Sequence, residues 1–290
     1  MRDSSFRQGL LGMTGGACFS TKLLRWNAEP ADMGSPLGSP NDPANTGRAV
    51  RDMFAAVAPR YDFLNHLLSA GFDIAWRKTT VMELRDVLRR PGSLALDVCC
   101  GTGDLAIALA RVSAGRVIGS DFCRPMLQRA KVKSAQLSDA KPRETSQAVP
   151  CFMEADTLAL PFPAGSLDVV SSAFGFRNLA SYARGLEEMH RVLKPGGVLA
   201  ILEFSRIRWP VVGPLFRFYF RRLLPRIGSW ISGTSGPYQY LPDSVARFPD
   251  QEELAKAMRA AGFSDVRYRN FFFGAAALHL ARKRSSPGRS

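Results

Sequence analysis

The sequence predicts an α/β fold in which a helical prologue precedes a doubly wound, mostly parallel sheet of seven strands. Short apolar runs alternate with amphipathic stretches from about residue 94 onward, a pattern typical of parallel sheets with helices on both faces. A Gly-Thr-Gly turn follows the first apolar run, at the place where an open α/β sheet binds its ligand. With 290 residues, 46% of them hydrophobic, the chain can bury a substantial core.

The N-terminal extension, residues 1–48, is predicted to be a disordered or targeting segment. It is rich in Gly, Ser, Pro and Asn and shows no sustained periodicity. Its arginines and serines fit an organelle transit peptide, whereas the acidic residues Asp3, Glu29 and Asp32 weaken that interpretation. Met33 also fits a misassigned start in a bacterial protein, so both interpretations stay open.

One domain is expected over residues 49–285, with residues 286–290 as a tail. In residues 49–90 apolar side chains recur at three- and four-residue spacing, broken at Pro59 and Gly71, which predicts the helical prologue. Strands are expected at residues 94–100, 116–122, 151–156, 167–175, 197–205, 265–274 and 275–283. Helices are expected at residues 104–112, 124–135, 181–193 and 250–262, with a weaker one near 158–160.

An aromatic-basic insert is expected at residues 205–245. Between residues 205 and 240 six arginines are interleaved with bulky aromatic residues, eight in all, and no acidic residue occurs. This composition favours peripheral contact with an anionic membrane, although single-stranded RNA or a solvated basic face over an aromatic core would accept it too. No run of 18 uncharged apolar residues exists in the chain, so no transmembrane span is predicted.

The five cysteines are scattered and show no C-x-x-C spacing, which argues against a disulfide framework or a structural zinc site and favours a reducing compartment. Cys99 and Cys100 are expected inside the first strand, on opposite faces of the sheet, as packing residues. None of the three histidines pairs at metal-ligand spacing, and we expect no metal.

Three features fall on successive strand ends. Gly101 and Gly103 permit close approach of a ligand to the main chain. Asp121, eighteen residues after Gly103, is expected to end the second strand and to accept hydrogen bonds from ribose hydroxyls. Asp156 is expected to end the third strand and to take an adenine amino group. The segment from Gly101 to Ala106 also fits the G-x-G-x-x-A pattern of a dinucleotide site, so a nicotinamide-dependent oxidoreductase stays an alternative.

Several longer motifs resemble a known family. Class I S-adenosylmethionine-dependent methyltransferases, which have a Rossmann-like fold, carry motifs similar to LDVCCGTGDLAIALA, VIGSDFCRPML, ADTLALPFPAGSLDVV and RVLKPGGVLAILEFS. The UbiE-type quinone C-methyltransferases of ubiquinone and menaquinone biosynthesis are similar more narrowly, through MFAAVAPRYDFLNHLLSAGFDIAWR, FGFRNL, LEFS and YQYLPDSVARFPDQEELAKAMRAAGF. The resemblance runs from about Val50 to Lys283.

The resemblance implies S-adenosylmethionine as cofactor. Carried over position by position, it places Gly101, Thr102 and Gly103 at the methionine end and Asp121 on the ribose. Asp156 and Thr157 match the adenine-side pair. Ala173 stands where many members carry a serine that touches the cofactor, so that contact is missing from the pattern here.

The resemblance also implies a polyprenyl quinol as substrate, with the menaquinone precursor demethylmenaquinol favoured and the 2-polyprenyl-6-methoxy-1,4-benzoquinol of ubiquinone biosynthesis as the alternative. Arg177 and Asn178 would face the quinol ring, and Tyr61 and Asp62 would help to close the site. A cytoplasmic protein at the inner face of the membrane is expected, or an organelle protein if residues 1–48 are a transit peptide. RNA methylation and a non-catalytic subunit role stay more remote alternatives, and no nucleic-acid partner is expected.

Overall fold

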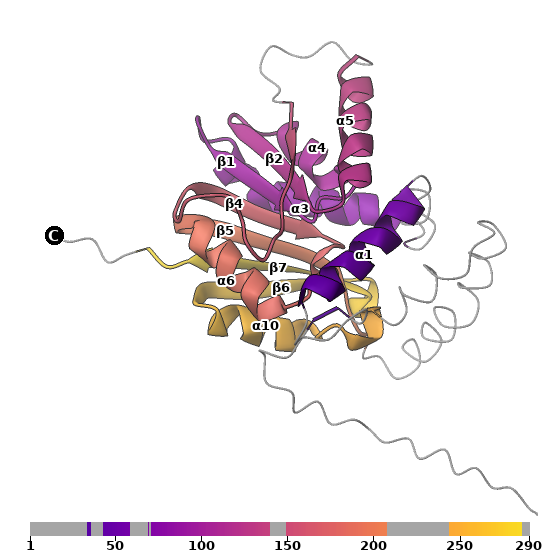
Figure 1. The fold of residues 1–290 in the computed structure, drawn as a ribbon. Coiled ribbons are helices and arrows are strands. Elements are labelled where there is room, and N and C mark those ends of the chain that lie inside the picture. The colour runs from indigo at the N-terminus through magenta and orange to yellow at the C-terminus, as the bar shows by residue number, and fades with distance from the viewer. Residues whose placement is uncertain are drawn as a thin grey trace, which may run out of the picture.

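The computed structural model describes residues 34–35, 43–58, 69, 71–139, 149–207 and 244–285 (Figure 1). In the described part of the prologue two helices precede a sheet of seven strands, and a helical prologue before seven strands is what the sequence predicted. The strands are β1 Leu94–Val98, β2 Arg116–Asp121, β3 Cys151–Glu154, β4 Leu167–Ala173, β5 Leu193–Phe204, β6 Phe263–Phe271 and β7 Ala276–Lys283. The helices are α1 Pro43–Val57, α3 Phe72–Leu88, α4 Asp104–Ala110, α5 Arg124–Asp139, α6 Tyr182–Val192 and α10 Gln251–Ala260.

The strand order is β3-β2-β1-β4-β5-β7-β6. Strands β1 to β5 run parallel, whereas β7 is antiparallel to both β5 and β6. The order reverses between β1 and β4, and such a switch point opens a crevice at the carboxyl ends of the strands. The fold therefore brings the ends of β1 and β4, separate in sequence, to the same place.

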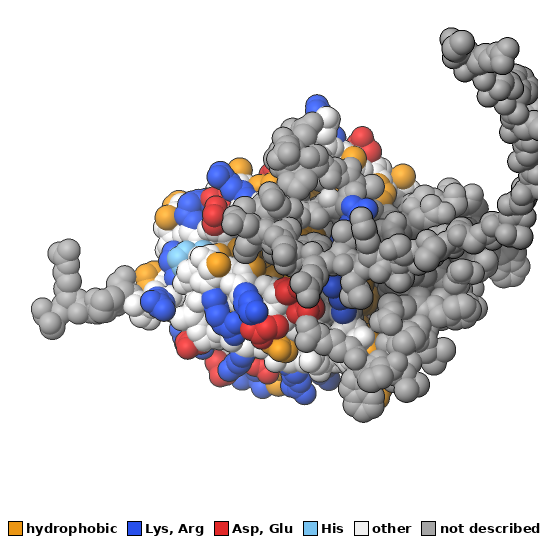
Figure 2. Space-filling view, turned by 90° about the horizontal axis from the view of Figure 1, so that it is seen from below, with side chains coloured by type: hydrophobic (Ala, Val, Ile, Leu, Met, Phe, Trp, Pro, Cys, Tyr) orange, Lys and Arg blue, Asp and Glu red, His pale blue; other side chains and the backbone are white. Residues whose placement is uncertain are grey.

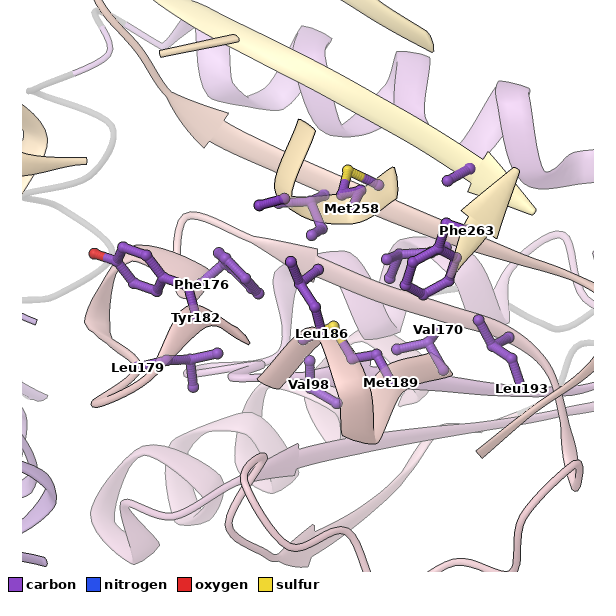
Figure 3. Packing of buried hydrophobic residues seen from close by; sticks show 14 of the residues in the cluster. Val98, Val170, Phe176, Leu179, Tyr182, Leu186, Met189, Leu193, Met258 and Phe263 are labelled. Carbon is purple, nitrogen blue, oxygen red and sulfur yellow. The ribbon is translucent and has the colours of Figure 1, made fainter. Parts of the chain in front are cut away.

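The sheet buries a hydrophobic core on each face because neighbouring residues of a strand point to opposite sides. Leu96, Val170 and Leu199 pack with α6 and α10 on one face. Their chain neighbours, such as Ala95 and Ala200, pack with α3 and α4 on the other. Figure 3 shows the first layer, in which Leu186, Met189 and Met258 lie together with the strand residues Val98 and Val170. The prediction of helices on both faces is confirmed.

Local sequence explains where several helices begin and end. Asp250 accepts hydrogen bonds from the backbone of Glu252 and Glu253, and the Glu253 side chain accepts one in return from the Asp250 nitrogen, a capping box that starts α10. Gly71 precedes α3 with a φ of 77°, a left-handed conformation that glycine adopts at low cost. The weak helix predicted near residues 158–160 is a turn instead, because the Asp156 side chain accepts the Leu158 N–H at 2.9 Å.

The boundary between the N-terminal extension and the helical prologue lies earlier in the structure than the predicted residue 48. Helix α1 begins at Pro43, since proline is favoured in the first turn of a helix. Gly34 and Ser35, within the extension predicted to be disordered, pack against the chain, with the Ser35 nitrogen donating to the Leu179 carbonyl at 2.7 Å. A Cβ on Gly34 would lie 2.1 Å from the Ala180 carbonyl oxygen, so only glycine fits that contact.

Most of the aromatic-basic insert, residues 208–243, lies outside the described residues. Within the described part of the chain no helix is long and apolar enough to span a bilayer. In the face seen in Figure 2, Lys and Arg side chains are interspersed with Asp and Glu rather than gathered into one basic stripe.

Candidate functional site

A small cavity of about 30 Å³ opens at the switch point of the sheet. It lies at the carboxyl ends of β1, β2 and β4, and helix α1 and the start of α5 also contribute to its wall. The lining residues are Phe54, Cys99, Gly101, Asp121, Phe122, Met126, Gly175, Asn178 and Leu179.

The glycine turn forms one wall of this cavity. Gly101 and Gly103 have φ values of 55° and 83°, both in the left-handed region. Gly103 also caps α4, and a Cβ there would lie 2.8 Å from the ring of Phe152. The turn is pinned by Asp104, the first residue of α4, which forms ion pairs with Arg77 and Lys133. Gly101 therefore places its backbone on the cavity wall, whereas Gly103 lies against the Phe152 ring.

The prediction that Cys99 and Cys100 lie inside the first strand was wrong. Strand β1 ends at Val98, and Cys99 has a φ of 51°, which turns the chain out of the sheet. The turn lets the backbone of Gly175 approach so closely that a Cβ on Gly175 would lie 2.5 Å from the Cβ of Cys99. Cys99 lines the cavity, and burial raises the pKa of both thiols well above its ordinary value. None of the described cysteines forms a disulfide.

Asp121 is an acidic side chain on the cavity wall. Its Oδ2 accepts the N–H of Gly101 at 2.9 Å, and its Oδ1 accepts the N–H of Cys123 at 2.8 Å. Burial raises its pKa to about 6, while these backbone donors oppose the rise by favouring the carboxylate. Because a carboxylate has about four lone-pair positions, room remains for a hydroxyl donor of a ligand.

The other four cofactor residues predicted from the sequence, Gly103 among them, do not line the cavity. The Thr102 hydroxyl is buried and accepts a bond from Lys133 Nζ at 3.5 Å, on the side of the turn that faces α5. Strand β3 ends at Glu154, so Asp156 follows the strand by two residues and is exposed. Thr157 is buried with its Oγ1 3.4 Å from Cys99 Sγ, which connects it to the cavity wall.

Asn178 and Arg177, both predicted to face the substrate, point in different directions. Asn178 lines the cavity at the end of the 3₁₀ turn η3 Phe176–Asn178. Arg177 is only 2% exposed, and its guanidinium donates to Glu203 Oε1 at 2.8 Å and to the Phe174 carbonyl. Its guanidinium carbon also lies 5.6 Å from the ring centre of Phe204. The structure therefore differs from the prediction for Arg177, because the buried carboxylate draws the guanidinium inward.

Two buried carboxylates were missed in the sequence. Glu203, 1% exposed, binds both the backbone and the side chain of Arg177. Asp97 accepts a bond from Ser171 Oγ at 2.7 Å, and burial raises its pKa to about 7. An acidic residue inside an otherwise apolar strand run was the available signal for both. Tyr61 and Asp62, predicted to close the site, lie outside the described residues.

No cluster of three or more His, Cys, Asp or Glu side chains with the arrangement of a metal site occurs among the residues that the structure describes.

Comparison with known sequences finds relatives whose names describe related methyltransferases. The chain is 45% identical over 250 residues to the demethylmenaquinone methyltransferase of Deinococcus radiodurans, covering 86% of this chain and 97% of that protein. It is 48% identical to the protein of the same name from Thermus thermophilus, covering 79% and 98%. It is also 44% identical to the ubiquinone/menaquinone biosynthesis C-methyltransferase UbiE of Geobacter sulfurreducens, covering 82% and 89%.

Comparison with solved structures shows the fold alone. A SAM-dependent methyltransferase of Thermotoga maritima, described as a possible histamine N-methyltransferase, matches with a TM-score of 0.55 and 17% identity, covering 81% of this chain and all of that one. The [4+2]-cyclase SpnF matches with a TM-score of 0.51 and 19% identity, covering 72% and 81%, so one fold serves different reactions. The sequence is more specific than the fold, because a family model matches residues 43–283. The chain belongs to the ubiE/COQ5 methyltransferase family.

Proposed function

We propose that this protein methylates a ring carbon of demethylmenaquinol with S-adenosylmethionine as the methyl donor. The observation that carries the proposal is that Asp121, Gly101 and Asn178, which come from three strand ends, line one cavity. The names of the relatives from Deinococcus and Thermus support the substrate. The benzoquinol precursor of ubiquinone is a second candidate, supported by the name of the Geobacter relative.

The residues of the cavity suit this donor. The Asp121 carboxylate, held by two backbone N–H groups, is oriented to accept bonds from the ribose hydroxyls. The left-handed backbone at Gly101 leaves room for the methionine portion against the main chain. Asp156 and Thr157 would take the adenine side, and Thr102 would meet the methionine end, although its hydroxyl bonds to Lys133 in this structure. When bound, the donor supplies an electrophilic methyl group on a positively charged sulfur.

The chain's own residues would position the acceptor. A quinol ring carbon becomes more nucleophilic as a phenolic proton leaves, and the oxidised quinone lacks that proton. Asn178 would orient the acceptor hydroxyl, or a water molecule that takes its proton, at the cavity wall. Arg177 is a positioning residue here, since its guanidinium binds Glu203 and fixes the turn that carries Asn178. Tyr61 and Asp62 would help to exclude water. Positioning of this kind supplies much of the rate acceleration.

The experiment that tests the function is methyl transfer from labelled S-adenosylmethionine to each reduced demethylquinone in detergent. We expect labelled menaquinol from the reduced naphthoquinone precursor and no product from the oxidised form. Faster labelling of the benzoquinol precursor would favour the second candidate. Binding of NAD, without binding of S-adenosylmethionine in isothermal titration, would contradict the proposal.

We also propose a peripheral position at the inner face of a bacterial membrane, with the insert at residues 205–240 as one contact. Its arginines and aromatic residues carry this proposal. An organelle location is the alternative if residues 1–48 act as a transit peptide. Cell fractionation of the tagged full chain, with and without residues 1–32, distinguishes the two.

A further inference from the structure

Four large apolar side chains are exposed together at one end of the structure. Phe72 and Ile74, in the first turn of α3, are 47% and 60% exposed, and Phe272 and Phe273, between β6 and β7, are 50% and 51% exposed. The rings of Phe72 and Phe272 stack with centres 5.5 Å apart, and those of Phe272 and Phe273 meet edge to face at 5.6 Å. We call these four residues the aromatic rim. Neighbouring exposed apolar residues of this size mark interaction surfaces more often than isolated ones do.

Two of these residues have a strained backbone conformation. Phe272 and Phe273 have φ values of 44° and 55°, in the left-handed region that bulky residues rarely adopt. Two hydrogen bonds stabilise this turn: Ala275 N donates to the Phe272 carbonyl at 3.0 Å, and Gln251 Nε2 donates to the Gly274 carbonyl at 3.3 Å. Strain of this kind persists where the surroundings impose it and is concentrated at functional sites.

The aromatic rim lies at the same edge of the sheet as the cavity. Phe204, the last residue of β5, pairs with Ala276, the first of β7, so the end of the hairpin stands beside the carboxyl end of β5. Ring contacts continue inward from Phe72 to Trp76 at 6.2 Å and from Trp76 to Phe174 at 6.2 Å. Phe174 immediately precedes the cavity residue Gly175. A continuous aromatic layer therefore links the surface to the turn that carries Asn178.

The charges around the aromatic rim are positive. Arg269 is exposed with its guanidinium carbon 5.8 Å from the ring centre of Phe271, and Lys78 is exposed one turn after Ile74 on α3. From residue 268 to 275 the sequence has no acidic residue, and from 72 to 78 the one acidic residue, Asp73, is buried against Arg77. Aromatic residues flanked by cations complement a bilayer surface with anionic headgroups.

We propose that the aromatic rim is a docking surface for an anionic lipid bilayer. Phe272 and Phe273 enter the interface between headgroups and acyl chains, and Lys78 and Arg269 face the headgroups. Docking brings the cavity edge of the sheet to the membrane from which a polyprenylated quinol is drawn. This last step rests on the proposed function, whereas lipid binding does not. The residues of the aromatic rim lie outside the insert in sequence.

Vesicle flotation of the full chain tests the docking directly. We expect binding to vesicles of phosphatidylcholine with phosphatidylglycerol and at least about a tenfold lower partition coefficient for the Phe272→Gly/Phe273→Gly variant. Glycine removes both rings while it suits the left-handed backbone, so the variant should fold. Phe72→Ser, on the other element, should lower binding in the same direction. The matched control, Val132→Ser/Leu137→Ser, removes two exposed apolar residues from α5 and should bind like the wild type.

A two-substrate assay separates the docking surface from the proposed function. With the docking correct, the Phe272→Gly/Phe273→Gly variant loses activity on a long-chain quinol in vesicles and keeps it on a short-chain, water-soluble quinol. If the wild type methylates neither quinol, the proposed function fails, and flotation still decides on the docking. Unchanged vesicle binding by both rim variants overturns the docking proposal. So does a change in sedimentation coefficient with unchanged vesicle binding, which would assign the aromatic rim to a second copy of the chain.

Discussion

Glu203 binds Arg177 at two points: one carboxylate oxygen accepts the guanidinium at 2.8 Å, and the other accepts the backbone nitrogen at 3.2 Å. The first oxygen also accepts the N–H of Phe204 at 2.9 Å. Through this pair, the end of β5 fixes the turn after β4 that presents Asn178 to the cavity. The pair is buried, with side-chain exposures of 3% and 1%, so its loss would leave a charge without its partner.

Replacement of one member of this pair should therefore be costly. We expect Glu203→Gln to lower the free energy of unfolding by about 3–5 kcal/mol, because the buried guanidinium loses its counter-charge. The exposed pair Arg259–Glu252 is the matched control, and Glu252→Gln should change stability by less than about 1 kcal/mol. Urea denaturation measures both variants. Equal effects at the two sites would contradict the role assigned to Glu203.

Activity of the Arg177 variants separates positioning from simple stability. We expect Arg177→Lys to bind S-adenosylhomocysteine with unchanged affinity while methyl transfer to the quinol falls, because the proposed donor contacts come from the other strands. A lysine cannot reproduce the fork of donors that Arg177 aims at Glu203 and Phe174. Isothermal titration and kcat at saturating quinol measure the two effects. A parallel loss of cofactor affinity would assign Arg177 a different role.

Asp121 should make cofactor affinity depend on pH. Its pKa in the folded protein is about 6, against an ordinary value of 3.8, so the unliganded site is largely protonated below pH 6. Because the ribose hydroxyls need an ionised acceptor, affinity should rise as the pH rises toward and past about 6. Below that value the Kd of S-adenosylhomocysteine should grow by up to about tenfold per pH unit. Titration between pH 5 and about 7.5 checks this, and an affinity that stays flat would contradict it.

The raised pKa of Asp121 should also affect the stability of the unliganded protein, which changes with pH in the opposite direction to cofactor affinity. Between the ordinary value of 3.8 and about 6, folded Asp121 holds a proton that the unfolded chain has released. The unliganded protein should therefore lose stability as the pH rises through this window. Asp121→Asn should flatten this contribution, and the amide nitrogen would also meet the N–H groups of Gly101 or Cys123. Thermal melts of both proteins across the window measure the difference.

A substitution at Gly103 in the glycine turn tests side-chain packing in addition to backbone strain. Gly103→Ala places a methyl group 2.8 Å from the Phe152 ring at a φ of 83°, so strain and overpacking add together. Gly165, with a φ of 67° and nothing within 4 Å of the added methyl, is the matched control for strain alone. We expect Gly103→Ala to cost about 1–3 kcal/mol more than Gly165→Ala. Urea denaturation compares them, and similar costs would show that the Phe152 ring moves freely.

The cysteines should differ in reactivity. Cys151 is exposed, whereas Cys99 and Cys100 are partly buried and have raised pKa values, so alkylation at pH 8 should modify Cys151 first. Cys99→Ala/Cys100→Ala should keep most cofactor affinity, while Cys99→Leu should weaken it because Cys99 lines the cavity. Peptide mass spectrometry follows the first effect and isothermal titration the second. Early modification of Cys99 would contradict its burial.

The sequence predicted those parts of the fold that depend on local pattern. The helix that begins near Asp250, the glycine turn that contains Gly103 and the strand end at Asp121 each depend on residues within a few positions. The direction of Arg177 depends on Glu203, 26 positions away, which the parallel pairing of β4 and β5 brings close. The turn at Cys99 packs against Gly175, which comes from another strand end. The partners in such long-range contacts cannot be identified from the residues around one position.

The reversal of strand order divides the site between two stretches of chain. Gly101 and Asp121 follow β1 and β2, whereas Asn178 and the Arg177–Glu203 pair belong to β4 and β5. The two stretches are joined by the pairing of β1 with β4 and, at the site, by the contact of Gly175 with Cys99. Substitutions in the β4–β5 stretch can therefore change the preferred methyl acceptor while the β1–β2 stretch is inherited unchanged. In this way one methyl-donor half of the fold can serve many acceptors.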